Sequence, residues 1–573
     1  MFARFRDPRS VLTTLCCAAL VFLIGCYGEP EIPADLVLLG GKVVTVDENV
    51  PDGQAIAMKG DTILAVGSNR EIRAWVGSET EVIDLDGKLA IPGFIDSHAH
   101  FTSIGNAKMQ LNLMEASSWD EIVAMVEAVV GDAGAGELIR GRGWHQEKWD
   151  ETPKQNVDGV PTHHSLSAVS PDNPVILTHA SGHAAFANAK AMAMSGINRR
   201  TRAPSGGEIV RDENGDPIGM FRETAQGLLR GAYEGSEPPA LRRLVELANE
   251  EVLSKGITTL HDAGSGIETI NFFKEMIDAG EIDVRLWVMV SGSNEELAMN
   301  LPDYKCIGYG NNHLTVRAIK RLLDGALGPH GAWLLEPYED LPSSTGLNTS
   351  SVASIEETAR LAALHDFQLG VHAIGDRANR ELIDIYERTF RANPDKTDWR
   401  WRNEHTQHLH PDDILRMGEL DIIAAMQGIH CTSDAIYVLE RLGERRAEEG
   451  AYVWQKLMAQ GVVISNGTDA PVEDVDPIAS YYATVSRKLA DGSVFFPDQR
   501  MSREEALASY TINGAYAGFE EDIKGSLTPG KLADVTVLSQ DILTISEDDI
   551  PATEVVYTIV GGEVVYERDA TEH

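Results

Sequence analysis

Eight short apolar runs, separated by longer amphipathic stretches, constrain the fold of this 573-residue chain more than any other feature. Helical patterns such as 241–253 and 355–364 fall between the runs, and such alternation is typical of parallel strands joined by helices. Eight parallel strands are the number that closes a barrel. The sequence therefore predicts an α/β fold, a TIM (β/α)8 barrel over residues 92–524, with strands at 93–98, 256–261, 284–290, 316–320, 369–372, 400–405, 422–427 and 462–467.

Two further regions do not follow this alternation. Residues from about 105 to 240 contain helical stretches and a hairpin-like pattern, and they are too long for a strand–helix loop and too structured for a linker. We expect them to form an inserted subdomain after barrel strand 1. Short strand-like runs also occur at both chain ends, and hairpins of this size are marginal alone. We predict that residues 33–91 and 525–567 pair into one composite β-sandwich domain.

Residues 1–26 have the composition of an export signal. A basic start precedes an apolar run over residues 11–24, which is shorter than the ~20 residues that a membrane-spanning helix needs. The run ends in Leu23-Ile24-Gly25-Cys26, which resembles the lipoprotein box of bacterial exported proteins. This resemblance implies a lipid anchor at Cys26 and a place in the bacterial cell envelope, periplasmic or on the outer face. An ordinary cleaved signal with an incidental cysteine is the alternative.

The composition narrows the range of partners. Acidic residues outnumber basic residues by 88 to 49, and the formal net charge is -39. Binding to nucleic acid requires clustered Lys and Arg, so we expect no nucleic-acid partner and no membrane contact except through Cys26. Only Cys306 and Cys431 lie beyond the signal, so the fold cannot rest on a disulfide framework. A homo-oligomer is compatible with the sequence.

Nearly every predicted strand ends in a side chain that can bind a metal or transfer a proton. The carboxyl ends of the strands are where TIM barrels carry their active sites. His98 and His100 are two residues apart on a strand, so both imidazoles face one side and can bind one ion. Later strands contribute Lys320, His372, His405 and Asp469. Four imidazoles and a carboxylate suit one or two divalent ions, with Zn²⁺ the best match.

Lys320 differs from the other candidates because an ammonium group repels a cation. Carboxylation of its amine by carbon dioxide would give an anionic carbamate that can bridge two metal ions. Lys320 lies within an apolar strand and precedes the segment Asp324-Gly-Ala-Leu-Gly, which favours an inward position. A surface or salt-bridged lysine is the alternative.

Several stretches of the chain form recognisable motifs: Phe94-Ile-Asp-Ser-His-Ala-His, Gly141-Arg-Gly-Trp, Gly182-His-Ala-Ala-Phe-Ala-Asn, Val371-His-Ala-Ile-Gly-Asp, Asn403-Glu-His-Thr-Gln, Met426-Gln-Gly-Ile-His and Gly467-Thr-Asp-Ala-Pro-Val. Together they resemble the metal-dependent amidohydrolase superfamily, and within it the branch of N-substituted formamide deformylase-like amidohydrolases. The resemblance extends from about residue 35 to about residue 567, with every motif in the family's order. It implies hydrolysis of a C–N bond in a small amide, formamide or cyclic amide.

The same resemblance implies a role for each candidate ligand. The more buried metal would be bound by His98, His100 and Asp469, the second metal by His372 and His405, and both by carboxylated Lys320. The metal would lower the pKa of bound water to about 7, and the hydroxide would attack the substrate carbonyl. Asp469 would take the proton and pass it to the leaving nitrogen. The alternative for Asp469 is a residue that only caps the following turn.

Three other residues are candidates for substrate binding. His430 follows the seventh predicted strand, while His183 and Arg142 belong to the inserted segment and can reach the site only if that segment covers the barrel mouth. For each, the alternative is a hydrogen-bonded structural residue.

Two other functions remain open at the level of the sequence. A lactone or ester hydrolase could use the same metal site, since hydroxide attacks either type of carbonyl. A non-catalytic, lipid-anchored solute-binding protein could use a barrel without any chemistry, although it would have no use for Asp469 in so rich a site.

Overall fold

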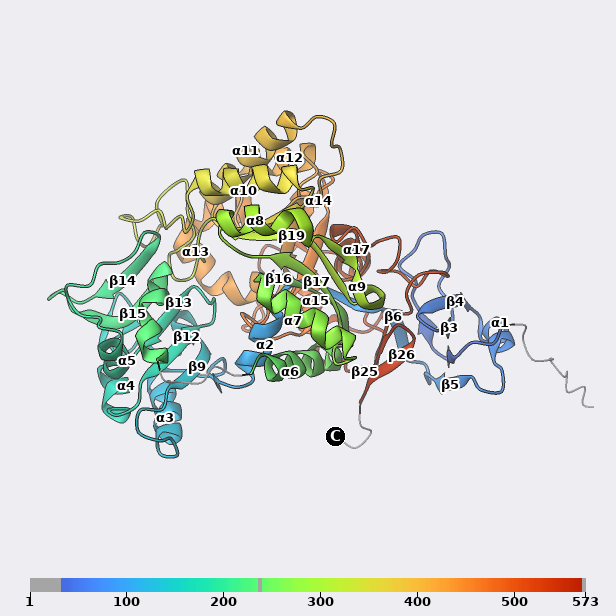
Figure 1. The fold of residues 1–573 in the computed structure, drawn as a ribbon, viewed down its shortest axis with the longest axis horizontal. Coiled ribbons are helices and arrows are strands. Elements are labelled where there is room, and N and C mark those ends of the chain that lie inside the picture. Colours follow the sequence, from blue (N-terminus) through green and yellow to red (C-terminus); the bar gives the residue numbers. More distant parts are fainter. Residues whose placement is uncertain (1–31, 235–239, 569–573) are drawn as a thin grey trace, which may run out of the picture.

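The computed structural model describes residues 32–234 and 240–568 (Figure 1). The predicted signal segment, including Cys26, lies outside the described residues. Within the two described ranges, none of the helices combines the length and the apolar character that a membrane span requires. Cys306 and Cys431 are both free thiols.

A barrel of parallel strands forms the centre of the molecule (Figure 1). Neighbouring strands are hydrogen-bonded in chain order from first to last. All eight predicted runs coincide with these strands, which confirms the TIM barrel. The strands are β7 (Phe94–Ala99), β16 (Ile257–Ser265), β17 (Arg285–Val290), β19 (Leu314–Leu322), β20 (Gln368–Ala373), β21 (Arg402–His405), β22 (Ile423–Gln427) and β23 (Ile464–Gly467).

The first and last strands meet where the barrel closes. The backbone N–H of Asp469 donates to the carbonyl of His98 at 2.7 Å, and the N–H of His100 donates to the carbonyl of Ala470 at 2.8 Å. A β-carbon at Gly467 would lie 2.4 Å from the backbone nitrogen of His98, so only glycine allows this approach. Closure of the barrel therefore places the segments that carry three candidate metal ligands side by side.

Helices cover the outside of the barrel, and the longer ones bury an apolar face against it. In α11, for example, Leu382, Ile383 and Tyr386 are buried, and the Tyr386 hydroxyl donates to the carbonyls of Leu369 and Arg402. The covering helices are α2 (Phe101–Ala107), α6 (Leu241–Ser254), α7 (Ile267–Asp278), α8 (Asn294–Tyr304), α9 (Tyr309–Asn312), α10 (Val352–Leu364), α11 (Asp376–Ala392), α12 (Pro411–Glu419), α13 (Gly428–Gly450), α14 (Trp454–Met458), α15 (Pro477–Ser486), α16 (Arg503–Ser509) and α17 (Ile512–Ala517).

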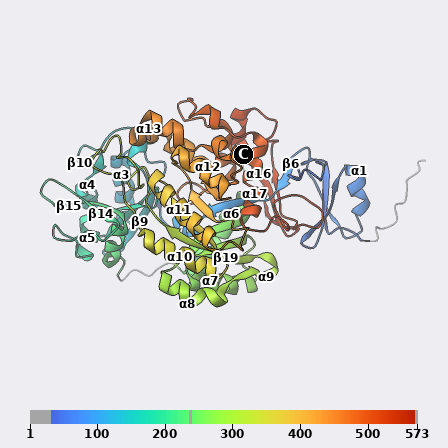
Figure 2. The ribbon, with the colours of Figure 1, turned by 90° about the horizontal axis from the view of Figure 1, so that it is seen from above.

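The segment between α2 and α6 folds around its own sheet, in the order β14-β15-β13-β12-β9-β8. Its core contains the buried aromatic side chains of Trp119, Trp144 and Phe186. It lies on the side of the barrel opposite the chain ends (Figures 1 and 2). Its main elements are β8 (Leu111–Asn112), α3 (Trp119–Val130), β9 (Ile139–Trp144), β10 (Asn156–Val157), β11 (Val160–Pro161), α4 (His164–Val169), β12 (Val175–His179), β13 (Ala184–Ala187), α5 (Ala189–Met194), β14 (Gly207–Arg211) and β15 (Pro217–Glu223).

Strands from the two ends of the described chain form two further sheets, β4-β3-β1-β5 and β2-β6-β24-β25-β26. In the second sheet β24 pairs with β6, with Thr536 opposite Ile91. A buried ion pair between Arg285 and Asp534 connects this sheet to the start of β17. The strands are β1 (Leu36–Leu39), β2 (Lys42–Val43), β3 (Ala55–Lys59), β4 (Thr62–Gly67), β5 (Glu81–Asp84), β6 (Leu89–Pro92), β24 (Val535–Leu538), β25 (Val555–Val560) and β26 (Glu563–Glu567), with α1 (Asn69–Ile72) beside them.

Candidate active site

Three buried side chains from distant parts of the chain converge at the carboxyl ends of the strands. His98 is the last residue but one of β7, His405 ends β21 and Asp469 follows β23, and their ligand atoms all lie within 4.8 Å of one another. Asp469 Oδ1 is 3.2 Å from His100 Nε2. Burial alone would raise the pKa of Asp469, but the surrounding imidazoles hold it well below its usual value. The cluster therefore keeps a carboxylate anion among nitrogen donors.

Lys320 and His372 complete the predicted set of ligands. Lys320 is buried, and its Nζ lies 3.1 Å from Nε2 of His98. Burial lowers the pKa of this amine, which favours its neutral, nucleophilic form. The ring of His372 lies 4.4 Å from that of His405, measured between centroids. The structure thus brings all six sequence-predicted metal residues together.

The chemistry of this donor set fits a divalent metal ion. Nε2 of His372 is buried and has no hydrogen-bond partner among residues 32–234 and 240–568. Buried polar atoms without partners are costly, and they are expected where a ligand completes the site. Burial and Lys320 lower the pKa of His98 to about 4, so the ring is in the neutral form that binds metals.

A second group of side chains holds the ligands in place, and the sequence analysis missed it. Glu404 contacts Nδ1 of His98 through its carboxylate, which leaves Nε2 facing the cluster. Arg402 donates two hydrogen bonds to the same carboxylate, at 2.7 and 3.0 Å, and all three side chains are fully buried. Carboxylates that receive the second nitrogen of a ligating histidine orient the ring and tune its basicity.

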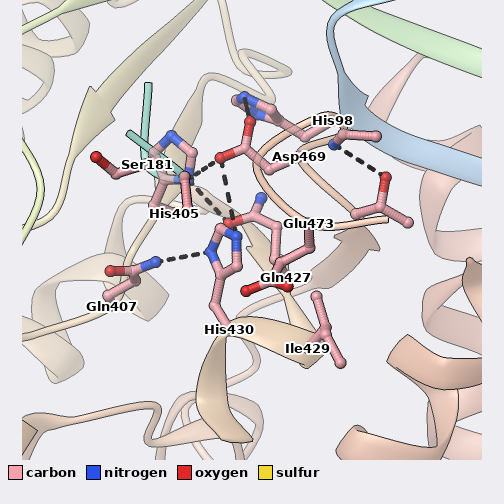
Figure 3. Close-up of polar contacts among 12 residues, drawn as sticks. His98, Ser181, His405, Gln407, Gln427, Ile429, His430, Asp469 and Glu473 are labelled. Atoms are coloured by element: carbon pink, nitrogen blue, oxygen red, sulfur yellow. Dashed lines mark hydrogen bonds and ion pairs between the residues drawn. The ribbon is translucent and has the colours of Figure 1, made fainter. Parts of the chain in front are cut away.

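Neutral amides hold two further imidazoles. Nδ1 of His405 lies 2.8 Å from Oε1 of Gln427, and the amide of Gln407 donates to Nδ1 of His430 at 2.9 Å. Figure 3 shows the rings of His405 and His430 directed toward the carboxylate of Asp469, with His430 Nε2 at 4.0 Å. His430 therefore lies beside the cluster, as its position after the seventh strand predicts.

Two site residues have backbone conformations that are unfavourable for residues other than glycine. His405 has a φ of 78° and Asp469 a φ of 58°. Non-glycine residues in this left-handed region cost about 1–3 kcal/mol and persist where the surrounding structure imposes them. The left-handed backbone conformation directs both side chains toward the cluster at the ends of their strands.

The inserted subdomain contributes to the same site. His183 lies with its ring 4.8 Å from that of His372, and its Nδ1 is 2.7 Å from Oε2 of Glu223. Although burial lowers the pKa of His183, the Glu223 carboxylate raises it above the usual value. Together with His100 and Arg142, His183 lines a cavity of about 630 Å³ between the insert and the barrel. The insert therefore covers the strand ends.

These observations agree with the comparison to known proteins. A model of the amidohydrolase family matches residues 81–566. The chain belongs to this family. It is accordingly a metal-dependent hydrolase of C–N bonds other than peptide bonds, and the comparisons do not favour an ester hydrolase or a binding protein.

The similarity extends over nearly the whole chain. The protein LONG AFTER FAR-RED 3 of Arabidopsis thaliana is 31% identical over 548 residues, which covers 93% of this chain and 92% of that protein. N-substituted formamide deformylase of Arthrobacter pascens is 28% identical over 545 residues, with 93% and 98% covered. The crystal structure of a metal-dependent hydrolase from Pyrococcus horikoshii OT3 matches with a TM-score of 0.71 at 25% identity, covering 90% of this chain and 99% of that one.

Proposed function

We propose that the substrate is a small amide or formamide and that Asp469 is the proton-transferring residue. The observation that carries the proposal is the convergence of His98, His405 and Asp469 within 4.8 Å, next to Lys320 and His372. The name of the Arthrobacter relative makes N-substituted formamides the first compounds to test.

The groups at the site have separate tasks in the proposed reaction. A divalent ion at this site would polarise the substrate carbonyl as a Lewis acid and make water acidic enough to react at neutral pH. Asp469, ionised and beside His100, can accept a proton from the attacking water and deliver it to the leaving nitrogen. His430 and His183 line a smaller inner pocket beside Asp469 and can donate hydrogen bonds to the substrate.

We further propose that the metal is Zn²⁺ and that Lys320 is carboxylated. Imidazole and carboxylate donors suit Zn²⁺. Lys320 is buried next to His98, and a carbamate would convert its charge from repulsive to attractive toward a cation. On this assignment His98, His100 and Asp469 bind one ion, His372 and His405 bind a second, and the carbamate bridges the two.

Metal content and a paired substrate assay test this function together. Purified protein should contain one to two zinc ions per chain by elemental analysis and should hydrolyse N-formyl or N-acyl amines faster than matched esters. A protein that contains metal but hydrolyses only the esters would refute amide hydrolysis. A protein that binds no divalent ion would refute the metal site.

The domain organisation is part of the proposal. We propose that the two sheets built from the chain ends are the faces of a composite β-sandwich, formed by residues 33–91 and 525–567, beside a hydrolase barrel over 92–524. A cluster of buried apolar residues that includes Leu38, Ile56, Val535 and Ile559 supports this pairing, because it draws on both sheets.

The location of the protein is a separate proposal. We propose that residues 1–26 are an export signal and that Cys26 anchors the protein by lipid to the bacterial cell envelope. The sequence Leu23-Ile24-Gly25-Cys26 after an apolar run supports this proposal.

A further inference from the structure

Arg142, on β9 of the insert, has fewer polar contacts than its charge requires. Its Nη2 donates to the carbonyl of Ala180 at 3.3 Å, while its Nε is buried and has no hydrogen-bond partner among the described residues. By contrast, the buried Arg285 and Arg402 each donate two hydrogen bonds to a carboxylate. Burial lowers the pKa of Arg142 to about 10, and the carboxylates of Asp469 and Glu473, beyond ion-pair distance, offset only part of this effect.

The position of this guanidinium is as unusual as its contacts. Arg142 lines the cavity of about 630 Å³ that contains His100 and His183. It also lines a second cavity of about 230 Å³, whose walls include the apolar side chains of Ile104 and Leu111. Arg142 therefore lies where the cavity over the candidate metal ligands meets a side cavity of mixed polar and apolar lining.

Other cations near these two cavities are already neutralised. Lys108 pairs with Glu251 at 2.6 Å, and Lys148, which lines the adjoining inner pocket, pairs with Glu473 at 3.6 Å. No carboxylate among residues 32–234 and 240–568 lies within ion-pair distance of Arg142. A guanidinium without an ion-pair partner can bind one planar anion of single charge. Carboxylates have this shape and charge, and a guanidinium binds them through two parallel hydrogen bonds.

We propose that Arg142 binds a carboxylate of the substrate, so that the substrates are N-formyl or N-acyl amino acids and not neutral amides. This inference rests on the proposed amide hydrolysis and deepens it. The net charge of -39 would by itself favour cationic substrates. A half-buried guanidinium beside the reacting groups opposes that preference locally, since it would repel a cationic substrate.

A series of paired substrates tests the proposal. The acids are N-formylglycine, N-formyl-β-alanine and N-formyl-4-aminobutyrate, which hold the carboxylate at increasing distances, and each is compared with its primary amide. In the wild-type enzyme we expect kcat/KM for at least one acid to exceed that of its amide by roughly 10- to 100-fold, the range of a charge-assisted pair. Arg142→Gln should remove this preference, mainly through KM.

A matched control comes from the same strand. Arg140 donates to Oδ1 of Asn106 at 3.2 Å and lies two residues from Arg142. Arg140→Gln therefore makes the same change of charge and side chain, and it should keep the preference for acids. Arg142→Lys, which keeps the charge but not the fork geometry, should retain part of the preference.

Two results would overturn the proposal: a wild-type preference for the amides throughout the series, or an unchanged preference for acids in Arg142→Gln. The first comparison needs no variant, so it holds even if Arg142→Gln fails to fold. Calorimetric binding of N-formylglycine to wild type and Arg142→Gln separates this inference from the proposed function. If no compound is hydrolysed but N-formylglycine binds to the wild type and not to Arg142→Gln, the proposed amide hydrolysis is refuted. The proposed carboxylate site at Arg142 is then supported.

Discussion

Replacing Glu404 by glutamine tests whether the carboxylate behind His98 acts on the metal site or only on the fold. Glutamine keeps the size of the side chain but removes the charge that faces Nδ1 of His98, and its single amide oxygen cannot accept both hydrogen bonds from Arg402 as the two carboxylate oxygens do. An uncharged amide leaves the His98 ring less basic and less firmly oriented. Metal affinity should therefore fall even though no ligand has been replaced.

We expect two losses from this change, one in metal affinity and one in folding stability. Loss of a carboxylate partner behind a ligating histidine typically costs about 10- to 100-fold in metal affinity or activity, which corresponds to about 1.4–2.7 kcal/mol. Breaking a buried ion pair costs about 3–5 kcal/mol of folding stability. Arg402 still donates to the carbonyl of Ser97 at 2.6 Å, so we expect the loss of stability to be near the lower limit.

Zinc affinity measured by chelator competition and stability measured by urea unfolding of the metal-free protein separate the two effects. Asp534→Asn is the matched control, because it breaks another buried carboxylate–arginine pair, with Arg285, far from the donor cluster. That variant should lose stability and keep its zinc affinity. If Glu404→Gln binds zinc as tightly as the wild type, or if Asp534→Asn weakens zinc equally, the argument for Glu404 is refuted.

The remaining predictions concern four other positions. Asp469→Asn should lower kcat by about 10²–10⁴-fold with the fold intact, and near-native turnover in a steady-state assay would contradict its role in proton transfer. Lys320→Ala should lose the bridging ligand and lower the metal content by elemental analysis, with partial rescue of activity by short carboxylates; full metal and activity would make Lys320 structural. Arg285 lowers the pKa of Asp534 against the effect of burial, so this pair stabilises the fold above the unfolded pKa of about 4 and less as the pH falls through the folded value. Urea unfolding should accordingly show that the gap between wild type and Asp534→Asn shrinks below about pH 4, and a pH-independent gap would contradict this. Cys26→Ser should move the protein from the membrane to the soluble fraction in cell fractionation, and continued sedimentation with membranes would exclude Cys26 as the anchor.

The barrel strands and the positions of the candidate metal ligands could be predicted because both depend on short stretches of sequence. Apolar runs of strand length identify the strands, and the rule that active sites lie at strand ends identifies His98, Lys320 and His372 without any structure. The inward position expected for Lys320 is confirmed, since its side chain is buried, whereas Arg321 next to it donates to the carbonyl of Gly292.

Glu404 could not be identified in the same way. On a regular strand, Glu404 and His405 would face opposite sides, and only one of them could belong to the site. The φ of 78° at His405 breaks this alternation, so that Glu404 contacts His98 while His405 also joins the cluster. Positive φ at a residue other than glycine depends on the surrounding fold, and the sequence carries no signal for it.

The insert shows a second limit of sequence reasoning. His183 and Arg142 lie on or beside strands of a sheet that has its own core, and only the docking of that sheet on the barrel gives them a common cavity. Glu223, which holds His183, comes from another strand of the same sheet. No periodicity relates these positions to the barrel, so their roles depend on packing between two bodies.

The arrangement of the chain also couples metal binding to folding. His98 is the last residue but one of the first barrel strand and Asp469 follows the last strand, and backbone hydrogen bonds join these segments directly. The donor cluster therefore exists only when the barrel is closed, so a metal ion that binds it stabilises the closed form by mass action. The sheets at the chain ends contact the barrel at the other end of its strands. There the ion pair between Arg285 and Asp534 joins the residue before β24 to the start of β17. The insert, which would select the substrate on our proposal, and the sheets from the chain ends thus contact opposite ends of the same strands.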